Sequence, residues 1–232
     1  MASLKEVKGR IASVNNTRKI TSAMKMVASA KLHKAQAAIE SMLPYERRLH
    51  HILTDFMSNC TEVTSPFIVK REVKKVAVVV FASNTSLCGG FNANVIRHLV
   101  DLLTEYKPLG LENILVFPVG KKVADAVRKL GFRIEGDFQH MADKPSYQEA
   151  ADLAADLMKR FLHGDVDKVE LLYNHFKSTA SQILTRETYL PIDLNNEKKE
   201  EERTIDYILE PSAEELMQEM LPKVLRMKMF TV

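Results

Sequence analysis

The stretch that decides the fold is VAVVVFA at residues 76–82. Its side chains are apolar on both faces and mostly β-branched, so it predicts a strand buried in the middle of a sheet. A glycine-containing turn at 83–90 follows, and then a helix for which Asn92 is the expected N-cap. A strand, a turn and a helix in this order form the first unit of an α/β domain.

Downstream of residue 82, strand-like and helix-like segments continue to alternate. We expect further strands at 113–119, 132–138, 168–176 and 182–190, and helices from Lys121 to Gly131 and from the capping box SYQE at 146–149. The last two strands have no helix between them, so they should pair as a hairpin. The prediction is an α/β fold over residues 76–208: a Rossmann-like, five-stranded, mostly parallel sheet with flanking helices.

Upstream of a linker at 58–75, residues 1–57 predict one long coiled-coil helix. Only Gly9 and Pro44 interrupt the helix-forming sequence between residues 4 and 56. Apolar or small residues recur at steps of three and four, which marks a seam along one side of a helix. The early seam residues are Leu4, Val7, Ile11, Val14, Thr17, Thr21, Met24 and Ala28. At about 1.5 Å per residue the helix would be roughly 80 Å long, which suits a shaft.

Residues 209–232 predict the start of a C-terminal helix. Its expected inward face consists of Met217, Met220, Leu221, Val224, Leu225 and Met229, and Pro222 is the expected site of a kink. The sequence stops without a helix end signal. We therefore expect most of this helix to be missing, and we expect it to be the natural partner of the first helix.

The charge of the chain is concentrated at its N-terminus. The net charge is only +3, but residues 1–35 hold eight lysine and arginine residues against one glutamate. Such a basic arm indicates an acidic partner: nucleic acid, phospholipid or an acidic protein surface. Basic-region DNA-binding helices place their charges before a leucine-rich zipper, whereas here the charges are interleaved with the seam. Three interpretations of the basic arm remain open. In order of preference, it contacts an acidic protein ring or groove, it is a helix face that is merely solvated, or it binds nucleic acid.

No persuasive active site is visible. The turn at 83–92 lies where a phosphate could bind, but it matches neither G-x-G-x-x-G nor a P-loop, so its glycines more often serve a tight turn and close helix–sheet packing. Two cysteines and seven histidines show no metal-ligand spacing. We expect no cofactor and no metal, and a nucleotide-binding α/β enzyme is kept as an alternative. No apolar run is long enough to span a membrane.

Three motifs resemble the γ subunit family of F-type ATP synthases. The first is IASVNNTRKITSAMKMVASAKL at 11–32, the second is LCGGFN at 87–92, and the third is the segment from Asp206 to Pro211. The match covers the whole chain, and its start is similar to bacterial members. Asn84-Thr85-Ser86 departs from the residues that many members carry before the second motif, which we interpret as turn variation.

The resemblance implies a non-catalytic central rotor stalk that couples proton flow through the membrane c-ring to ATP chemistry at the β subunits. Its implied partners are the α and β subunits, the ε subunit and the c-ring, with no nucleic acid and no direct membrane span. The implied ring contacts are Arg10, Lys19, Met24, Lys25, Lys31 and Lys34; Tyr207 and Glu210 would lie on the c-ring and ε side, and Cys88, Gly89 and Gly90 would form a structural turn. The implied location is peripheral, at the cytoplasmic face of the bacterial plasma membrane.

Overall fold

The computed structural model describes residues 3–59, 65–178, 181–192 and 213–232. These residues divide into two compact units, Met1–Arg48 and Leu49–Val232. The first unit is helical from Leu4 onward, and the second is the α/β unit. The helix α1 (Leu4–Asn59) runs through the first unit into the second.

The sheet of the α/β unit has five strands in the order β3-β2-β1-β4-β5. The strands are β1 (Val76–Phe81), β2 (Ile114–Val119), β3 (Arg133–Ile134), β4 (Lys168–Ser178) and β5 (Ser181–Leu190). β1 pairs in parallel with β2 and β4, β2 pairs in parallel with β3, and only β4 and β5 are antiparallel. The predicted mostly parallel five-stranded sheet, its central first strand and its terminal hairpin are confirmed.

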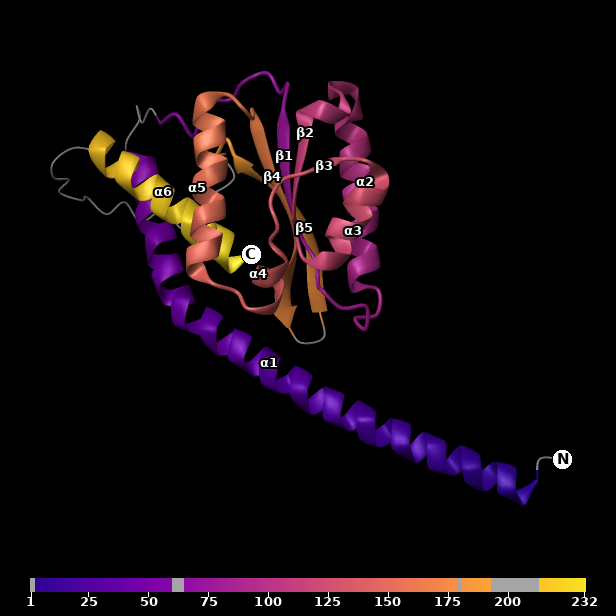
Figure 1. Ribbon diagram of the computed structural model, residues 1–232. Helices are drawn as coiled ribbons and strands as arrows, with labels where there is room; N and C mark the ends of the chain where they lie inside the picture. The colour runs from indigo at the N-terminus through magenta and orange to yellow at the C-terminus, as the bar shows by residue number, and fades with distance from the viewer. Residues whose placement is uncertain (1–2, 60–64, 179–180, 193–212) are drawn as a thin grey trace. The chain divides into compact units, whose positions relative to one another are not determined.

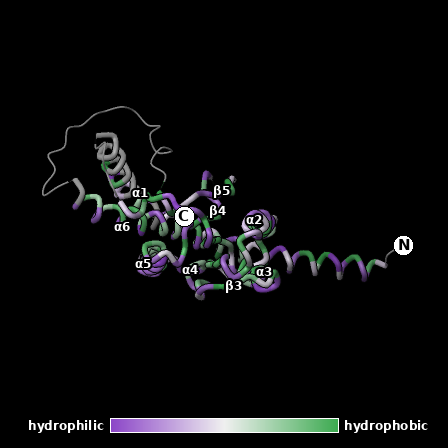
Figure 2. Tube along the Cα trace, turned by 90° about the horizontal axis from the view of Figure 1, so that it is seen from above, coloured by the Kyte–Doolittle hydropathy of each residue, from purple (hydrophilic) through white to green (hydrophobic). Residues whose placement is uncertain are grey.

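Helices cover both faces of this sheet (Figures 1 and 2). One face carries α2 (Phe91–Tyr106) and α3 (Lys121–Leu130), and the other carries α5 (Tyr147–His163) and α6 (Ala213–Thr231). Short helical turns, η1 (Lys107–Leu109), η2 (Leu111–Asn113) and α4 (Gln139–Asp143), connect the longer elements. Successive residues of β1 alternate between the two cores, since Val78 belongs to the core that contains Leu99 of α2 and Val79 to the core that contains Leu157 of α5. Because both faces of β1 contact an apolar core, every residue of the strand has to be apolar.

Three local predictions about the ends of elements were wrong. The third strand is confined to Arg133–Ile134 because Gly136, at φ 73°, turns the chain out of the extended conformation. α2 begins at Phe91 with Gly90 as its N-cap, and the side chain of Asn92 fastens the preceding turn instead of capping the helix. Ser146 does occupy the N-cap of α5 but makes no side-chain cap bond. Its expected partner in the capping box, Glu149, lies beside His140 instead, with Oε1 3.1 Å from Nδ1.

The C-terminal helix α6 packs beside α5 on the same face of the sheet and contributes to the core there. Met217, Leu221, Leu225 and Met229 are almost fully buried there, as the helical spacing predicts. Met220 and Val224 are only partly buried, and the helix continues through Pro222. The apolar face that the sequence predicted packs against α5 and the sheet. The pairing of the continuation of this helix with the first helix stays a prediction.

Within the described ranges, no helix combines the length and the apolar character needed to cross a membrane.

Candidate partner-binding surfaces

The basic side chains of α1 are exposed. Arg10, Lys19, Lys25, Lys31 and Lys34 all lie in the exposed class. Arg10 already has a partner, because its Nη2 lies 2.7 Å from Oε1 of Glu6 one helical turn earlier. In the described part of the chain the four lysines make no ion pair. Their charge is therefore available to an acidic surface outside the chain.

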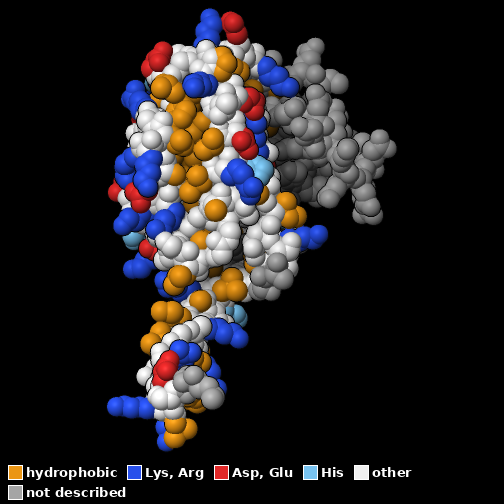
Figure 3. Space-filling view, turned by 90° about the vertical axis from the view of Figure 1, so that its right-hand side faces the viewer, with side chains coloured by type: hydrophobic (Ala, Val, Ile, Leu, Met, Phe, Trp, Pro, Cys, Tyr) orange, Lys and Arg blue, Asp and Glu red, His pale blue; other side chains and the backbone are white. Residues whose placement is uncertain are grey.

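Apolar side chains are exposed on α1 as well, and they are not restricted to the seam. Val14 on the seam is 67% exposed, and Met24, expected as a ring contact, is 56% exposed. Met26 is 68% exposed although it lies two residues beyond Met24, nearly on the opposite side of the helix. Figure 2 shows hydrophobic and hydrophilic positions alternating along the helix, and Figure 3 shows hydrophobic side chains next to lysine and arginine side chains on it. A helix that is apolar on more than one side fits an environment that surrounds it better than a single partner helix.

The polar residues of the seam satisfy their own hydroxyl groups. Thr17 Oγ1 donates to the carbonyl oxygen of Ser13 at 3.0 Å, and Thr21 Oγ1 donates to that of Thr17 at 2.8 Å. These bonds to the preceding turn are the usual way in which a helix accommodates threonine. Thr17 and Thr21 therefore require no hydrogen-bonding partner outside the helix and can present their methyl groups.

The glycine turn is held by its own polar groups. Ser83 N donates to Asn92 Oδ1 at 3.0 Å, and Asn92 Nδ2 donates to the carbonyl oxygen of Thr85 at 2.8 Å. Asn84 links the turn to its neighbours by accepting from Lys121 N at 2.7 Å and donating to Gln139 O at 2.9 Å. The polar side chains of Asn84 and Asn92 are therefore used to hold the turn together and to attach it to its neighbours.

Of the two glycines of this turn, only Gly89 has a backbone conformation that favours glycine. Gly89 has φ 57°, in the left-handed region, so it supplies the conformation of a tight turn. A Cβ on Gly90 would come no closer than 3.5 Å to another atom, the Nδ2 of Asn94, so close helix–sheet packing is not the reason for the second glycine. Cys88 is half-buried, with Sγ 3.7 Å from Thr85 O.

The remaining predicted contacts, Tyr207 and Glu210, lie outside the described residues.

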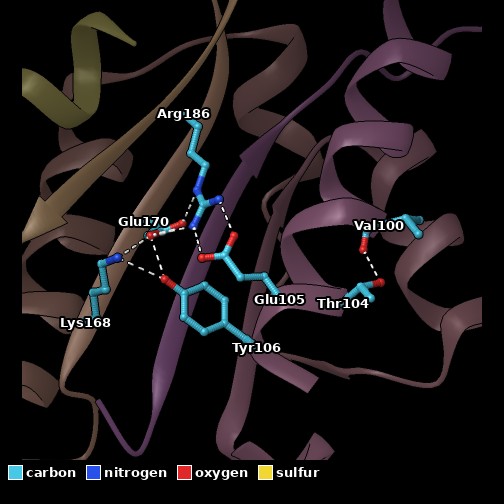
Figure 4. A network of polar contacts seen from close by, with 7 residues as sticks. All are labelled: Val100, Thr104, Glu105, Tyr106, Lys168, Glu170 and Arg186. Carbon is cyan, nitrogen blue, oxygen red and sulfur yellow. Dashed lines mark hydrogen bonds and ion pairs between the residues drawn. The ribbon is translucent and has the colours of Figure 1, made fainter. Parts of the chain in front are cut away.

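A buried carboxylate in the α/β unit was missed by the sequence analysis. Glu170 on β4 is 2% exposed and accepts from Tyr106 OH at 2.7 Å and from Arg186 Nε at 2.7 Å, while Lys168 Nζ lies 2.6 Å away (Figure 4). Arg186 on β5 also donates to Glu105 on α2 at 2.6 Å. The sequence carries a signal that could have revealed this cluster. Glu170 interrupts an otherwise apolar strand, and Arg186 lies on the other strand of the predicted hairpin. The cluster joins α2 to the hairpin.

The electrostatics of this cluster are those of a satisfied structural network. Burial acts to raise the pKa of Glu170, but the hydrogen bonds from Arg186, Lys168 and Tyr106 outweigh it and hold that pKa below its usual value. The hydrogen bond from Arg186 is likewise the main reason why the pKa of Glu105 is lowered. Because every charge has a partner, the cluster has no group poised to exchange a proton near neutral pH.

A metal site is not formed by the residues that the structure describes, because no three His, Cys, Asp or Glu side chains come together as ligands. A shallow hollow beside α4 and α5 is lined by Asp137, His140, Glu149, Asp152 and Asp156 among others. Its histidine is already next to Glu149. The hollow therefore gives no separate indication of a ligand.

Comparison with known proteins points to one family. The family model described as ATP synthase matches residues 3–232. The chain is 80% identical over 234 residues to the ATP synthase gamma chain of Phocaeicola vulgatus, covering 100% of this chain and 81% of the relative. It is 60% identical to the gamma chain of Bacteroides thetaiotaomicron over 242 residues, with the same coverage.

The fold is also found in a solved structure. A chain of the central stalk and c-ring of the Tetrahymena thermophila mitochondrial ATP synthase is similar with a TM-score of 0.60 and 20% identity. The similarity covers 91% of this chain and 90% of that one. At this identity the likeness concerns the fold.

Proposed function

The chain belongs to the ATP synthase family as one of its γ chains, and on that premise we propose that it couples ion flow through a membrane c-ring to ATP synthesis and hydrolysis. It is a non-catalytic subunit of the central stalk, and catalysis belongs to the β subunits. The alternative of a nucleotide-binding enzyme is therefore not retained. The coupling ion that we propose is the proton.

In this proposal α1 is half of the rotor shaft inside a ring of α and β subunits. The observation that carries it is the surface of α1, where unpaired lysines and exposed apolar side chains occur together. Lys25 and Met24 are neighbours of this kind, and Met26 extends the apolar surface beyond the seam. A ring lined by acidic loops and apolar side chains would bind such a helix from several sides, with the charges adding orientation more than affinity.

The α/β unit is the foot of the rotor in this proposal. Its sheet is covered by helices on both faces, and the Glu170 cluster ties α2 to the β4–β5 hairpin. A unit packed and cross-linked in this way is suited to carry load without deforming. We place Tyr207 and Glu210 on the side that meets the c-ring and the ε subunit, and we place the whole protein at the cytoplasmic face of the bacterial plasma membrane.

The basic arm is assigned to protein and not to nucleic acid. Its lysines share the helix with exposed apolar residues such as Val14 and Met26, whereas phosphate contacts alone would not require an apolar surface. Binding to duplex DNA that falls steeply with salt and prefers a sequence would contradict this assignment.

Co-purification tests the proposal. The full-length chain, tagged and isolated under native conditions from its own cells, should bring down α and β subunits in an ATPase-active complex. ATP hydrolysis should reside in that complex, and the isolated chain should show neither hydrolysis nor stoichiometric nucleotide binding by calorimetry. Isolation of the chain alone, or ATP hydrolysis by the chain alone, would overturn the assignment.

A further inference from the structure

The attachment of α6 to the sheet is built on soft apolar packing. Met217 and Met229 belong to the core beside the sheet and are each 1% exposed. Leu221 and Leu225 lie between them. Methionine is unbranched and flexible, so it fills gaps well but resists sliding or rotation of a helix poorly. Apolar contacts are also non-directional. This interface alone leaves the register of α6 weakly specified.

A buried hydroxyl supplies direction to the same interface. Tyr189 on β5 is 1% exposed, and its OH donates to the carbonyl oxygen of Leu225 on α6 at 2.7 Å. Burial raises the pKa of Tyr189, so the hydroxyl remains a donor at any physiological pH. The bond therefore holds the turn of α6 that contains Leu225 next to Tyr189 of the sheet.

An ion pair one helical turn further on provides a second point. Glu187 Oε1 lies 3.4 Å from Lys228 Nζ, as an ion pair more than a hydrogen bond. Glu187 is itself held by Tyr173 on β4, whose pKa is raised to about 12 by burial first and then by the Glu187 carboxylate that it bonds. The bond from Tyr173 therefore holds the Glu187 carboxylate in place on the sheet.

The two points lie between the same two elements. Although a bulge interrupts the regular alternation of β5 at Tyr189, both Glu187 and Tyr189 reach α6, since Glu187 pairs with Lys228 and Tyr189 bonds to Leu225. Leu225 and Lys228 are three residues apart on a helix, so they lie on one side of it. Two separate attachments between the same pair of elements resist both rotation and sliding, which a single attachment does not.

We propose that Tyr189 and Glu187 are positioning residues that lock α6 to the sheet in one rotational register, so that a foot turned by the c-ring turns the C-terminal helix with it. The inference rests on the proposed rotor function. In this inference the β5–α6 contact transmits torque, and the methionine-rich face of α6 holds the helix against the sheet.

The test uses the complete ATP synthase, assembled with the full-length chain, in inverted membrane vesicles. The variant carries Tyr189→Phe and Glu187→Gln, which remove the hydroxyl and the charge while keeping the volume. The readout is the ratio of ATP-driven proton pumping to ATP hydrolysis. We expect this ratio to fall at least about twofold, since two directional contacts of ordinary strength are lost, with unchanged hydrolysis and unchanged incorporation of the chain.

A matched control and a rescue sharpen the result. Glu219→Gln breaks an exposed pair with Lys223 on the same helix, where the two groups lie 2.6 Å apart, and should leave the ratio unchanged. Lys228→Glu should lower the ratio, and adding Glu187→Lys should restore it. Equal loss in the Glu219 control, or a reversed pair that does not rescue, would overturn the inference.

Two further outcomes separate this inference from its premise. An unchanged ratio in the Tyr189→Phe, Glu187→Gln variant overturns the locking role, and so does a loss of assembly and hydrolysis together, which would mean a merely structural role. If vesicles with the unaltered chain incorporate it and hydrolyse ATP but never pump, the proposed rotor function itself fails.

Discussion

Arg186 and Glu170 form a two-pronged pair across the β4–β5 hairpin, with Nε 2.7 Å from Oε2 and Nη2 3.1 Å from Oε1. The carboxylate is 2% exposed while the arginine side chain is 38% exposed, so the buried member depends on the accessible one. The same guanidinium reaches Glu105 on α2. One side chain at the surface thus holds a buried charge and bridges three elements of the α/β unit.

Removing this arginine should destabilise the α/β unit strongly. Among the residues that the structure describes, Arg186→Met leaves Glu170 with Lys168 as its one cationic partner, and it should cost about 3 kcal/mol of unfolding free energy, as for other buried pairs that lose one member. The measurement is urea unfolding of the chain. Arg128→Met, which breaks an exposed pair with Asp125, should change the free energy by less than about 0.5 kcal/mol. Equal effects from both variants would contradict the assignment.

The stability of the unit should fall on acidification because of Glu170. Its pKa in the fold is below the ordinary value of 4.5, so its contribution is complete above about pH 4.5 and is lost as pH falls through the lower folded value. Thermal unfolding followed between pH 7 and pH 3 should show this loss. Glu170→Gln should lower stability at pH 7 and flatten the acid slope. An unchanged slope in that variant would assign the acid sensitivity to other groups.

Two glycines should respond to alanine in opposite ways. Gly120 has φ 110°, and a Cβ there would lie 2.1 Å from the carbonyl oxygen of Ala82, so Gly120→Ala should be severely destabilising. Gly9 lies in α1 with nothing within 4 Å, so Gly9→Ala should increase helix stability by about 0.5–1 kcal/mol. Circular dichroism during thermal unfolding measures both. A stabilising Gly120→Ala would contradict the geometry of the β2–α3 turn.

The parts of the fold that the sequence predicted are those encoded locally. The apolar run at 76–82 and the absence of a helix between 168–176 and 182–190 were enough for the central strand and the hairpin, because period and connection length are properties of a short segment. The C-terminal stop of α3 at Gly131, in the left-handed conformation, is similarly local.

What the sequence could not predict depends on tertiary register. The partners of Glu170 come from α2 and β5, and recognising them requires knowing that residue 170 faces residue 188 with a bulge beside it. Asn92 was assigned to a helix cap because its type and position fit one, but the turn before it offered closer partners. The bond from Tyr189 to Leu225 depends on which surface α6 packs against, which its apolar periodicity does not specify.

The lysines of α1 should matter for coupling and hardly for folding. Lys25 is exposed and makes no ion pair in the described part of the chain, so Lys25→Ala should change the unfolding free energy by less than about 0.5 kcal/mol. In the assembled complex, where we propose that this charge faces acidic loops of the ring, the same change should alter ATP hydrolysis or the pumping ratio, with a dependence on salt concentration. Lys159→Ala, at an exposed position of α5, is the matched control and should change neither. A large drop in melting temperature with unchanged coupling, or an equal effect of Lys159→Ala, would remove Lys25 from the proposed contact surface.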